Sequence, residues 1–471
     1  MDSLRFDPSR YETRTVTLEG RSVTFCAYLS VPYVRQPVCP EWQTLNLFVP
    51  AAYYDEDNAV INGFTIDTAP IYFPNTIGAY MSGRADEPGP SFRNYAKGKT
   101  NASFFALERG FIVVSPATRG RDSRDAYGNL AGTAPAAVVD LKAAVRYLRY
   151  NRDVIPGDVE KIISDGTSAG GALSALLGAT GNAAAYEPYL EEIGAARERD
   201  DIFAAMCYCP IMNLEHADMA YEWLLKEEKR FHSMRFLRVD GVVKMQPFEG
   251  DLNAEQLEAG EELRNEFVQY VNSLSLSDDE GQPLRLNADG SGSLRDLLQA
   301  ALCRCAQAAA DRGTDLSAIP YVTLDGGQVT SFDLDAHVRA CGRMKPCPSF
   351  DEWDGSSPEN EEFGGGNERS RHFGANSARH DKAGLSMADP EMIRMMNPME
   401  WLKDESCQAK HWRVRHGSAD CHTSWAIPLL FAQSLKKAGL PVDFAYAWGE
   451  PHSGNYDMDD LFAWMEAICR A

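Results

Sequence analysis

One pentapeptide constrains the fold of this chain more than any other feature. Gly166-Thr167-Ser168-Ala169-Gly170 matches G-x-S-x-G, a sharp turn that joins a β-strand to an α-helix and exposes a serine hydroxyl. The flanking sequence fits, because 162–164 reads as a strand and 169–177 is rich in Ala and Leu, as in a helix. The glycines leave the tight turn free of side chains. The sequence therefore predicts that Ser168 is a nucleophile.

The pattern around this turn predicts an α/β fold. Strands are expected at 44–50, 69–74, 110–115, 162–164 and 202–208, and a helix at 136–150. This β-α-β rhythm implies a parallel sheet covered by helices on both faces.

The middle of the chain has a different composition, richer in charged residues, Gly and Asn, with helical patterns at 255–275 and 294–312. The α/β rhythm then returns, with elements expected at 411–415, 424–438, 442–448 and 458–469. We expect one split α/β domain, formed by 1–210 and 397–471, with an inserted domain at 211–396.

A serine hydroxyl needs a base to accept its proton. In folds with this turn the partners follow in the order Ser, acid, His. Asp420 comes just after strand 411–415, and His452 comes just after strand 442–448. Because the carboxyl ends of parallel strands meet at one edge of a sheet, we expect His452 to be the base and Asp420 to orient it.

Four other residues fit these roles less well. His416 and His422 lie near Asp420 but precede the final strand. Asp443 lies within a predicted strand, and Asp457 follows the proposed base.

An ester carbonyl under attack develops a negative oxygen that needs hydrogen-bond donors. The backbone N–H of Ala169, at a helix N-terminus, is one candidate. The loop 74–80 follows an early strand, and we expect its backbone at Ala79 or Gly78 to supply a second donor; the alternative is an ordinary turn.

Composition excludes several classes of partner. The net charge of −22 over 471 residues argues against binding to nucleic acid or to an anionic membrane. No basic and apolar leader is visible at the start, and no apolar run approaches the ~20 residues of a membrane span. We therefore expect a cytoplasmic location.

The eleven cysteines show no spacing typical of a disulfide framework. Two Cys-x-Cys pairs, Cys207/Cys209 and Cys303/Cys305, lack a matching cluster at zinc spacing. Most cysteines are expected to be free thiols, and neither a metal nor a cofactor is expected.

Taken together, these segments resemble bacterial tannases of the intracellular type, which are tannin acyl hydrolases. The matching pieces are 47–53, 74–76, 119–121, 166–171, 213–223, 357–360, 412–417 and 451–454. The resemblance implies an α/β-hydrolase fold with a lid inserted after the half that carries the turn. It also implies hydrolysis of galloyl and related phenolic esters through Ser168, Asp420 and His452.

The resemblance further implies a site for the gallate hydroxyls. In the family a Lys, a Glu and an Asp hold them, and the Lys and Glu match Lys345 and Glu359. The Asp position, two residues after the catalytic Asp, is His422 here. An imidazole can donate as well as accept, whereas a carboxylate only accepts. We therefore expect His422 to shift specificity or to weaken gallate binding.

Two alternatives stay open. One is an esterase for another aromatic ester, such as a hydroxybenzoate, a cinnamate or a ferulate. The other is a binding module without catalysis, which the intact Ser, His and Asp disfavour. The sequence leaves the alcohol group and the oligomeric state undetermined.

Overall fold

The structure, a computed structural model, describes residues 4–55, 58–91, 98–239, 242–403 and 407–470 and centres on one nine-stranded sheet. The strands lie in the spatial order β1 (Glu12–Leu18), β2 (Arg21–Pro32), β3 (Thr44–Pro50), β5 (Ile112–Pro116), β4 (Pro70–Pro74), β6 (Asp158–Thr167), β7 (Ala204–Tyr208), β12 (His411–Gly417) and β13 (Val442–Ala447). In the described part of the chain, the long segment between β7 and β12 adds no strand to this sheet.

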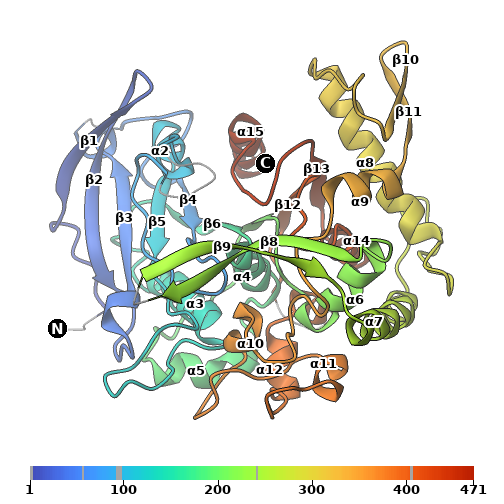
Figure 1. The fold of residues 1–471 in the computed structure, drawn as a ribbon. Coiled ribbons are helices and arrows are strands. Elements are labelled where there is room, and N and C mark those ends of the chain that lie inside the picture. The colour runs from blue at the N-terminus through green and yellow to red at the C-terminus, as the bar shows by residue number, and fades with distance from the viewer. Residues whose placement is uncertain (1–3, 56–57, 92–97, 240–241, 404–406, 471) are drawn as a thin grey trace.

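Helices cover the sheet on both sides. In Figure 1, α2 and α15 lie in the upper part of the view, and α3 and α5 lie in the lower part. The helices that follow core strands are α2 (Ala102–Glu108), α3 (Ala136–Tyr150), α4 (Ala169–Ala179), α14 (Ala426–Lys437) and α15 (Met458–Arg470). Short α1 (Ala52–Asp55) follows β3, and α5 (Glu187–Glu192) lies between α4 and β7. Strands β4, β5 and β7 are buried along their whole length, as expected for strands covered on two faces.

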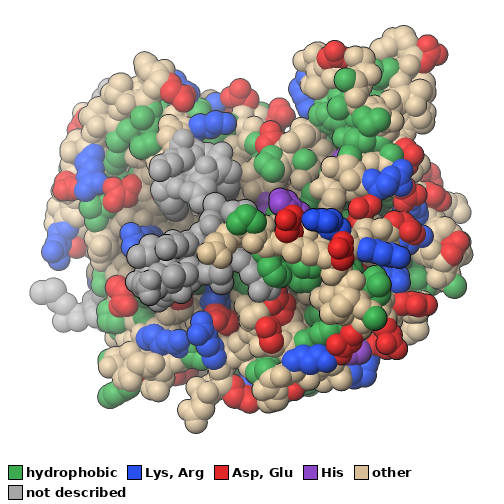
Figure 2. Space-filling view, viewed as in Figure 1, with side chains coloured by type: hydrophobic (Ala, Val, Ile, Leu, Met, Phe, Trp, Pro, Cys, Tyr) green, Lys and Arg blue, Asp and Glu red, His purple; other side chains and the backbone are tan. Residues whose placement is uncertain are grey.

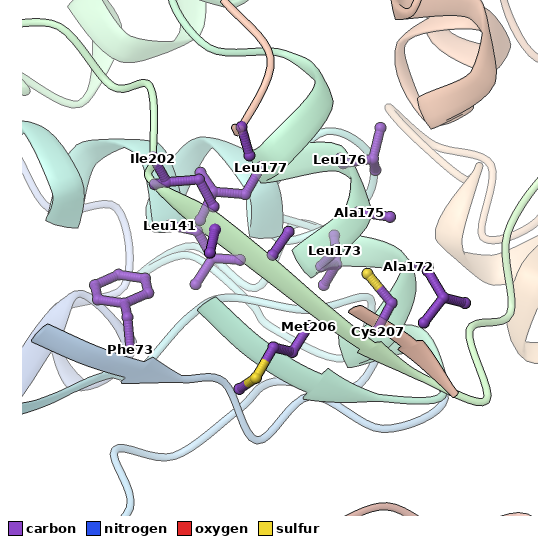
Figure 3. Packing of buried hydrophobic residues seen from close by; sticks show 14 of the residues in the cluster. Phe73, Leu141, Ala172, Leu173, Ala175, Leu176, Leu177, Ile202, Met206 and Cys207 are labelled. Atoms are coloured by element: carbon purple, nitrogen blue, oxygen red, sulfur yellow. The ribbon is translucent and has the colours of Figure 1, made fainter. Parts of the chain in front are cut away.

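The close packing of α4 on the sheet explains its Ala-rich and Gly-rich sequence. In Figure 3, Cys207 of β7 points toward Ala172 and Leu173 of α4, and Met206 points to the opposite face. This alternation is the two-residue period of a strand. A Cβ on Gly178 would lie 2.8 Å from the Cβ of Ala205, so the helix could not approach the sheet so closely with larger residues.

The prediction of a wholly parallel sheet is wrong at one edge. Strands β1, β2 and β3 pair antiparallel, and β3 is antiparallel to β5. For β1 and β2 the reason is the two-residue turn Glu19-Gly20, whose positive φ angles of 51° and 77° suit a hairpin that reverses the chain. The other neighbours in the sheet are parallel.

The segment between β7 and β12 builds separate elements. Its helices are α6 (Leu214–Leu224), α7 (Ala254–Ser273), α8 (Ser293–Asp311), α9 (Leu334–Cys341), α10 (Pro358–Glu362), α11 (Ala375–Arg379), α12 (Pro390–Met395) and α13 (Pro398–Trp401). Its strands form two hairpins, β8 (Arg230–Val239) with β9 (Val242–Asp251) and β10 (Val322–Asp325) with β11 (Gln328–Phe332). The β8–β9 hairpin crosses in front of the main sheet in Figure 1.

The described surface is mixed in charge. On the face in Figure 2, acidic and basic side chains are interspersed around a small group of histidine atoms. No described helix combines the length and the apolar character that crossing a membrane requires.

Candidate active site

Ser168 lies at the tip of the turn between β6 and α4. Its backbone has φ 65° and ψ −126°, a region that L residues rarely adopt. The turn is tight enough that a Cβ on Gly166 would lie 2.1 Å from the carbonyl oxygen of Gly170. The N–H of Ser168 donates to the carbonyl oxygen of Tyr208 at 2.9 Å, which ties the turn to the end of β7. The predicted sharp turn is therefore present.

Asn75, at the end of β4, holds this turn from the other side. Its Nδ2 donates to the carbonyl oxygens of Asp165 and Gly170, both at 3.1 Å, and contacts Ser174 Oγ at 3.0 Å. Sequence reasoning placed Asn75 in a loop and gave it no role, because its partners are distant in sequence. Two signals pointed to Asn75: it directly follows a predicted core strand, and it lies in segment 74–76, which carries the family resemblance.

His452 and Asp420 form the expected pair at the carboxyl ends of β13 and β12. His452 Nδ1 donates to Asp420 Oδ2 at 2.8 Å, and the N–H of His422 donates to Asp420 Oδ1 at 2.9 Å. Both carboxylate oxygens are thus engaged. With Nδ1 as the donor, Nε2 of His452 is left as the proton acceptor.

The surroundings of Asp420 favour its charged form. Burial alone would raise the pKa of Asp420, but the histidines His452 and His416 lower it, and the net shift is downward. Burial, and then the nearby His452, lower the pKa of His422 to about 3, so its imidazole is neutral at physiological pH. The site therefore places a fixed negative charge behind His452 and a neutral imidazole beside it.

Cys209 and His416 lie beneath this pair. Their ligand-capable atoms and those of Asp420 lie within 4.8 Å of one another, and this is the one trio of possible metal ligands among the described residues. Neither nitrogen of His416 has a hydrogen bond of good geometry, and burial lowers its pKa to about 4. Because Asp420 already accepts a hydrogen bond from His452, we interpret Cys209 and His416 as buried residues that pack against Asp420 rather than as metal ligands.

The alternative acids are occupied elsewhere. Asp443 pairs with Arg413 and Arg415, and Asp457 accepts from the hydroxyl of Tyr208 at 2.6 Å. Among the described residues, the acid that contacts His452 by a hydrogen bond is Asp420, not Asp443 or Asp457. The cysteines of the two Cys-x-Cys pairs are free thiols, as are all eleven cysteines of the chain.

A cavity of about 230 Å³ opens beside the serine. Ser168 and His452 line it together with Lys345, Glu359 and His422. It is smaller than the roughly 300–1,000 Å³ of sites for drug-sized ligands, so it suits one small aromatic group. A larger cavity of about 530 Å³ lies nearby, but neither the serine nor the histidine lines it.

Lys345 is held by its neighbours on the inserted segment. Its Nζ lies 3.6 Å from the ring centroid of Phe350, a cation–π contact. The preceding Arg343 forms a buried two-pronged ion pair with Glu222, at 2.6 and 2.8 Å. These contacts fix the chain that carries Lys345 against α6.

Lys345 and Glu359 affect each other's charge. Burial lowers the pKa of Lys345, and Glu359 raises it in part. Burial raises the pKa of Glu359, and Lys345 lowers it in part. Each group therefore favours the charged form of the other, which suits a pair that would bind neighbouring hydroxyl groups.

Of the expected oxyanion donors, Ala79 lines the cavity, and Ala169 is the first residue of α4. Ala79 has φ 48°, and its carbonyl oxygen accepts from Arg121 Nε at 2.8 Å. The guanidinium of Arg121 also pairs with Glu361 of α10, the helix that carries Glu359. Gly78 is exposed and is absent from the cavity lining among the described residues.

Comparisons with known proteins identify relatives that match nearly the whole chain. The BD-FAE family model matches residues 89–234. The solved tannase from Lactobacillus plantarum is 42% identical, with a TM-score of 0.94 over 99% of this chain and 100% of that one. The Fusobacterium nucleatum tannase is 41% identical, with a TM-score of 0.93 over 99% of both chains. A tannin acyl hydrolase in complex with ethyl gallate is 42% identical, with a TM-score of 0.92 over 99% of both chains. No curated protein sequence matches the chain.

Proposed function

The chain belongs to the tannase family, and from this premise we propose that it hydrolyses esters of gallic acid or of closely related phenolic acids. It is a carboxylic ester hydrolase with the α/β-hydrolase fold, as expected from the sequence. The observation that carries the proposal is one cavity lined by a nucleophile, a base and polar groups suited to phenols.

In the proposed first step, Ser168 Oγ attacks the ester carbonyl while His452 Nε2 accepts its proton. Asp420 holds the imidazole by the 2.8 Å hydrogen bond and stabilises the imidazolium. The N–H groups of Ala169 and Ala79 are the proposed donors to the negative oxygen, with Gly78 as the neighbouring alternative. His452 then returns the proton to the alcohol as it leaves, and the acyl group remains on Ser168.

The second step repeats this chemistry with water. His452 accepts a proton from water, whose oxygen attacks the acyl carbon. The bond to Ser168 Oγ breaks, the serine regains its proton, and the carboxylic acid leaves. No metal or cofactor takes part in this scheme.

Three polar side chains are proposed to recognise the acyl ring. Lys345 and Glu359 face the cavity with opposite charges, which suits neighbouring phenolic hydroxyls that accept from one group and donate to the other. His422 completes the set as a neutral imidazole. It also favours a second candidate function, in which a less hydroxylated benzoate or a ferulate is the preferred acyl group.

We propose that residues 211–396 form a lid over the core. In support, Lys345 and Glu359 belong to this segment, whereas Ser168 and His452 belong to the core. A cytoplasmic location is also proposed, because eleven free thiols are typical of a reducing compartment.

A panel of small esters tests the substrate assignment. The kcat/KM of the purified protein would be measured on methyl gallate, methyl protocatechuate, methyl 4-hydroxybenzoate and methyl ferulate. We expect methyl gallate to be the best substrate. Because hydrogen bonds to charged groups are worth about 1.5–3 kcal/mol, Glu359→Gln and Lys345→Met should each lower its kcat/KM by at least about tenfold.

The controls are 4-nitrophenyl acetate, which lacks ring hydroxyls, and Lys382→Met, which removes an exposed lysine. Neither substitution in the cavity should slow 4-nitrophenyl acetate strongly. If methyl 4-hydroxybenzoate or methyl ferulate were preferred, the second candidate function would replace the first.

A further inference from the structure

Two cysteines meet where the inserted segment contacts the core. Cys341 ends α9, and Cys421 directly follows Asp420. The thiol of Cys421 donates to the backbone carbonyl oxygen of Cys341 at 3.5 Å, so the two residues are in direct contact. Both residues are only partly buried. The pair is therefore preassembled and open to a small reagent.

The surroundings of Cys341 favour its thiolate. Its sulfur lies 3.9 Å from both nitrogens of His337, whose Nε2 donates to the carbonyl oxygen of Ser418 at 2.9 Å. Hydrogen bonds from Cys421 and then from His337 lower the pKa of Cys341. The same contact raises the pKa of Cys421. A low-pKa thiol beside a second thiol is the arrangement found in redox-sensitive cysteines.

We propose that Cys341 and Cys421 are an oxidation site at which a peroxide joins them in a disulfide. The thiol of Cys341 first loses its proton to solvent, and the thiolate attacks one peroxide oxygen. The O–O bond breaks to give a sulfenic acid and hydroxide, and the hydroxide takes up a proton from solvent to become water. The sulfur of Cys421 then attacks the sulfenic sulfur, the S–S bond forms, and the S–O bond breaks to release a second water. One peroxide is reduced, two thiols are oxidised, and a dithiol reductant reverses the reaction.

The proposed disulfide would move two segments that line the cavity, one that carries Lys345 and one that carries Asp420. The hydroxyl of Tyr221 donates to the carbonyl oxygen of Cys421 at 3.0 Å and accepts from the N–H groups of Met344 and Lys345 at 3.2 and 3.4 Å. The chain that carries Lys345 and the loop that carries Asp420 are thus already linked through this phenol. Drawing the two sulfurs together would shift both segments, and small misplacements of catalytic groups cost large factors in rate.

The chemical test maps the bond directly. The purified full-length protein is treated with hydrogen peroxide, blocked with iodoacetamide and digested with trypsin. We expect a disulfide-linked pair of the peptides 340–343 and 416–436, which disappears after dithiothreitol. The matched control is Cys407→Ser, which removes the exposed cysteine and should leave the linked pair unchanged. Absence of the linked pair at full oxidation of accessible thiols would overturn the proposal.

The functional test follows ester hydrolysis in the same samples and rests on the proposed function. Oxidised wild type is expected to lose at least about tenfold in kcat/KM and to recover with dithiothreitol, whereas Cys341→Ser should keep its activity in peroxide. An equal loss of kcat/KM in peroxide-treated wild type and Cys341→Ser would show that the disulfide does not regulate ester hydrolysis. If no ester is hydrolysed even by reduced protein, the proposed function fails, and the peptide map still decides whether the bond forms.

Discussion

At the scale of single residues, His422 is the cavity residue that departs from the family pattern, which has an Asp at this position. Its ring centroid lies 4.4 Å from that of His452, and it lines the same cavity as the serine. Because burial lowers its pKa to about 3, it presents one donor and one acceptor rather than a charge. A carboxylate here would only accept, which suits a third phenolic hydroxyl.

Replacing His422 by Asp should therefore favour the most hydroxylated substrate. We expect His422→Asp to raise the ratio of kcat/KM for methyl gallate over methyl 4-hydroxybenzoate by about tenfold, in line with one charged hydrogen bond. The ratio cancels any change in His452 common to both substrates. His422→Gln, which keeps a neutral donor and acceptor, should leave the ratio near that of wild type. An unchanged ratio in His422→Asp would remove His422 from acyl recognition.

At this scale, sequence reasoning located residues whose chemistry is local. Ser168 lies in a five-residue pattern, and His452 follows a recognisable strand. Asn75 and Tyr221 could not be assigned roles, because their partners lie on segments distant in sequence. Such residues carry no reactive group that would single them out in a sequence.

Among the elements, strand β12 places an unusual residue in the core. His416, near its end, is fully buried, lies 3.3 Å from Asp420 through Nε2, and has no hydrogen bond of good geometry. Burial lowers its pKa to about 4, whereas an unfolded chain binds the proton near pH 6.5. The unfolded state therefore binds more protons between these values, and stability falls as the pH drops through this window.

Phenylalanine keeps the ring shape at position 416 without the titration. We expect His416→Phe to reduce the loss of unfolding free energy between pH 6.5 and pH 5 by about 2 kcal/mol. Urea denaturation at both pH values measures this difference. His232→Gln is the control, because that imidazole is exposed. Identical pH dependence in wild type and His416→Phe would contradict this account, because it would show that folding leaves the pKa of His416 unchanged.

The sequence predicted the buried strands and helices of the core well and the polar hairpins poorly, for physical reasons. Buried strands and the helices that cover them follow simple apolar patterns, so β3, β7, α3 and α15 were located within a few residues. The β1–β2 hairpin was missed because its alternating polar edge strand resembles surface loop sequence. The β8–β9 and β10–β11 hairpins were missed for a similar reason, since β10 and β11 have few fully buried residues.

At the scale of the whole molecule, the cavity is lined by residues of both the core and the segment between β7 and β12. Arg121 of the core holds the carbonyl of Ala79 and pairs with Glu361 of α10, and Tyr221 bridges Cys421 to Lys345. The change in composition predicts an insertion that begins near residue 211, but no local pattern could indicate which part of this segment meets the serine. That information resides in pairings between distant segments.

The most direct test of the account is the kcat/KM of Ser168→Ala on methyl gallate, with circular dichroism to show that the fold is retained. Loss of a serine nucleophile removes the acyl-enzyme route, so we predict a fall of at least about 10⁴-fold relative to wild type. Retention of activity within tenfold of wild type would contradict the central claim that Ser168 attacks the ester.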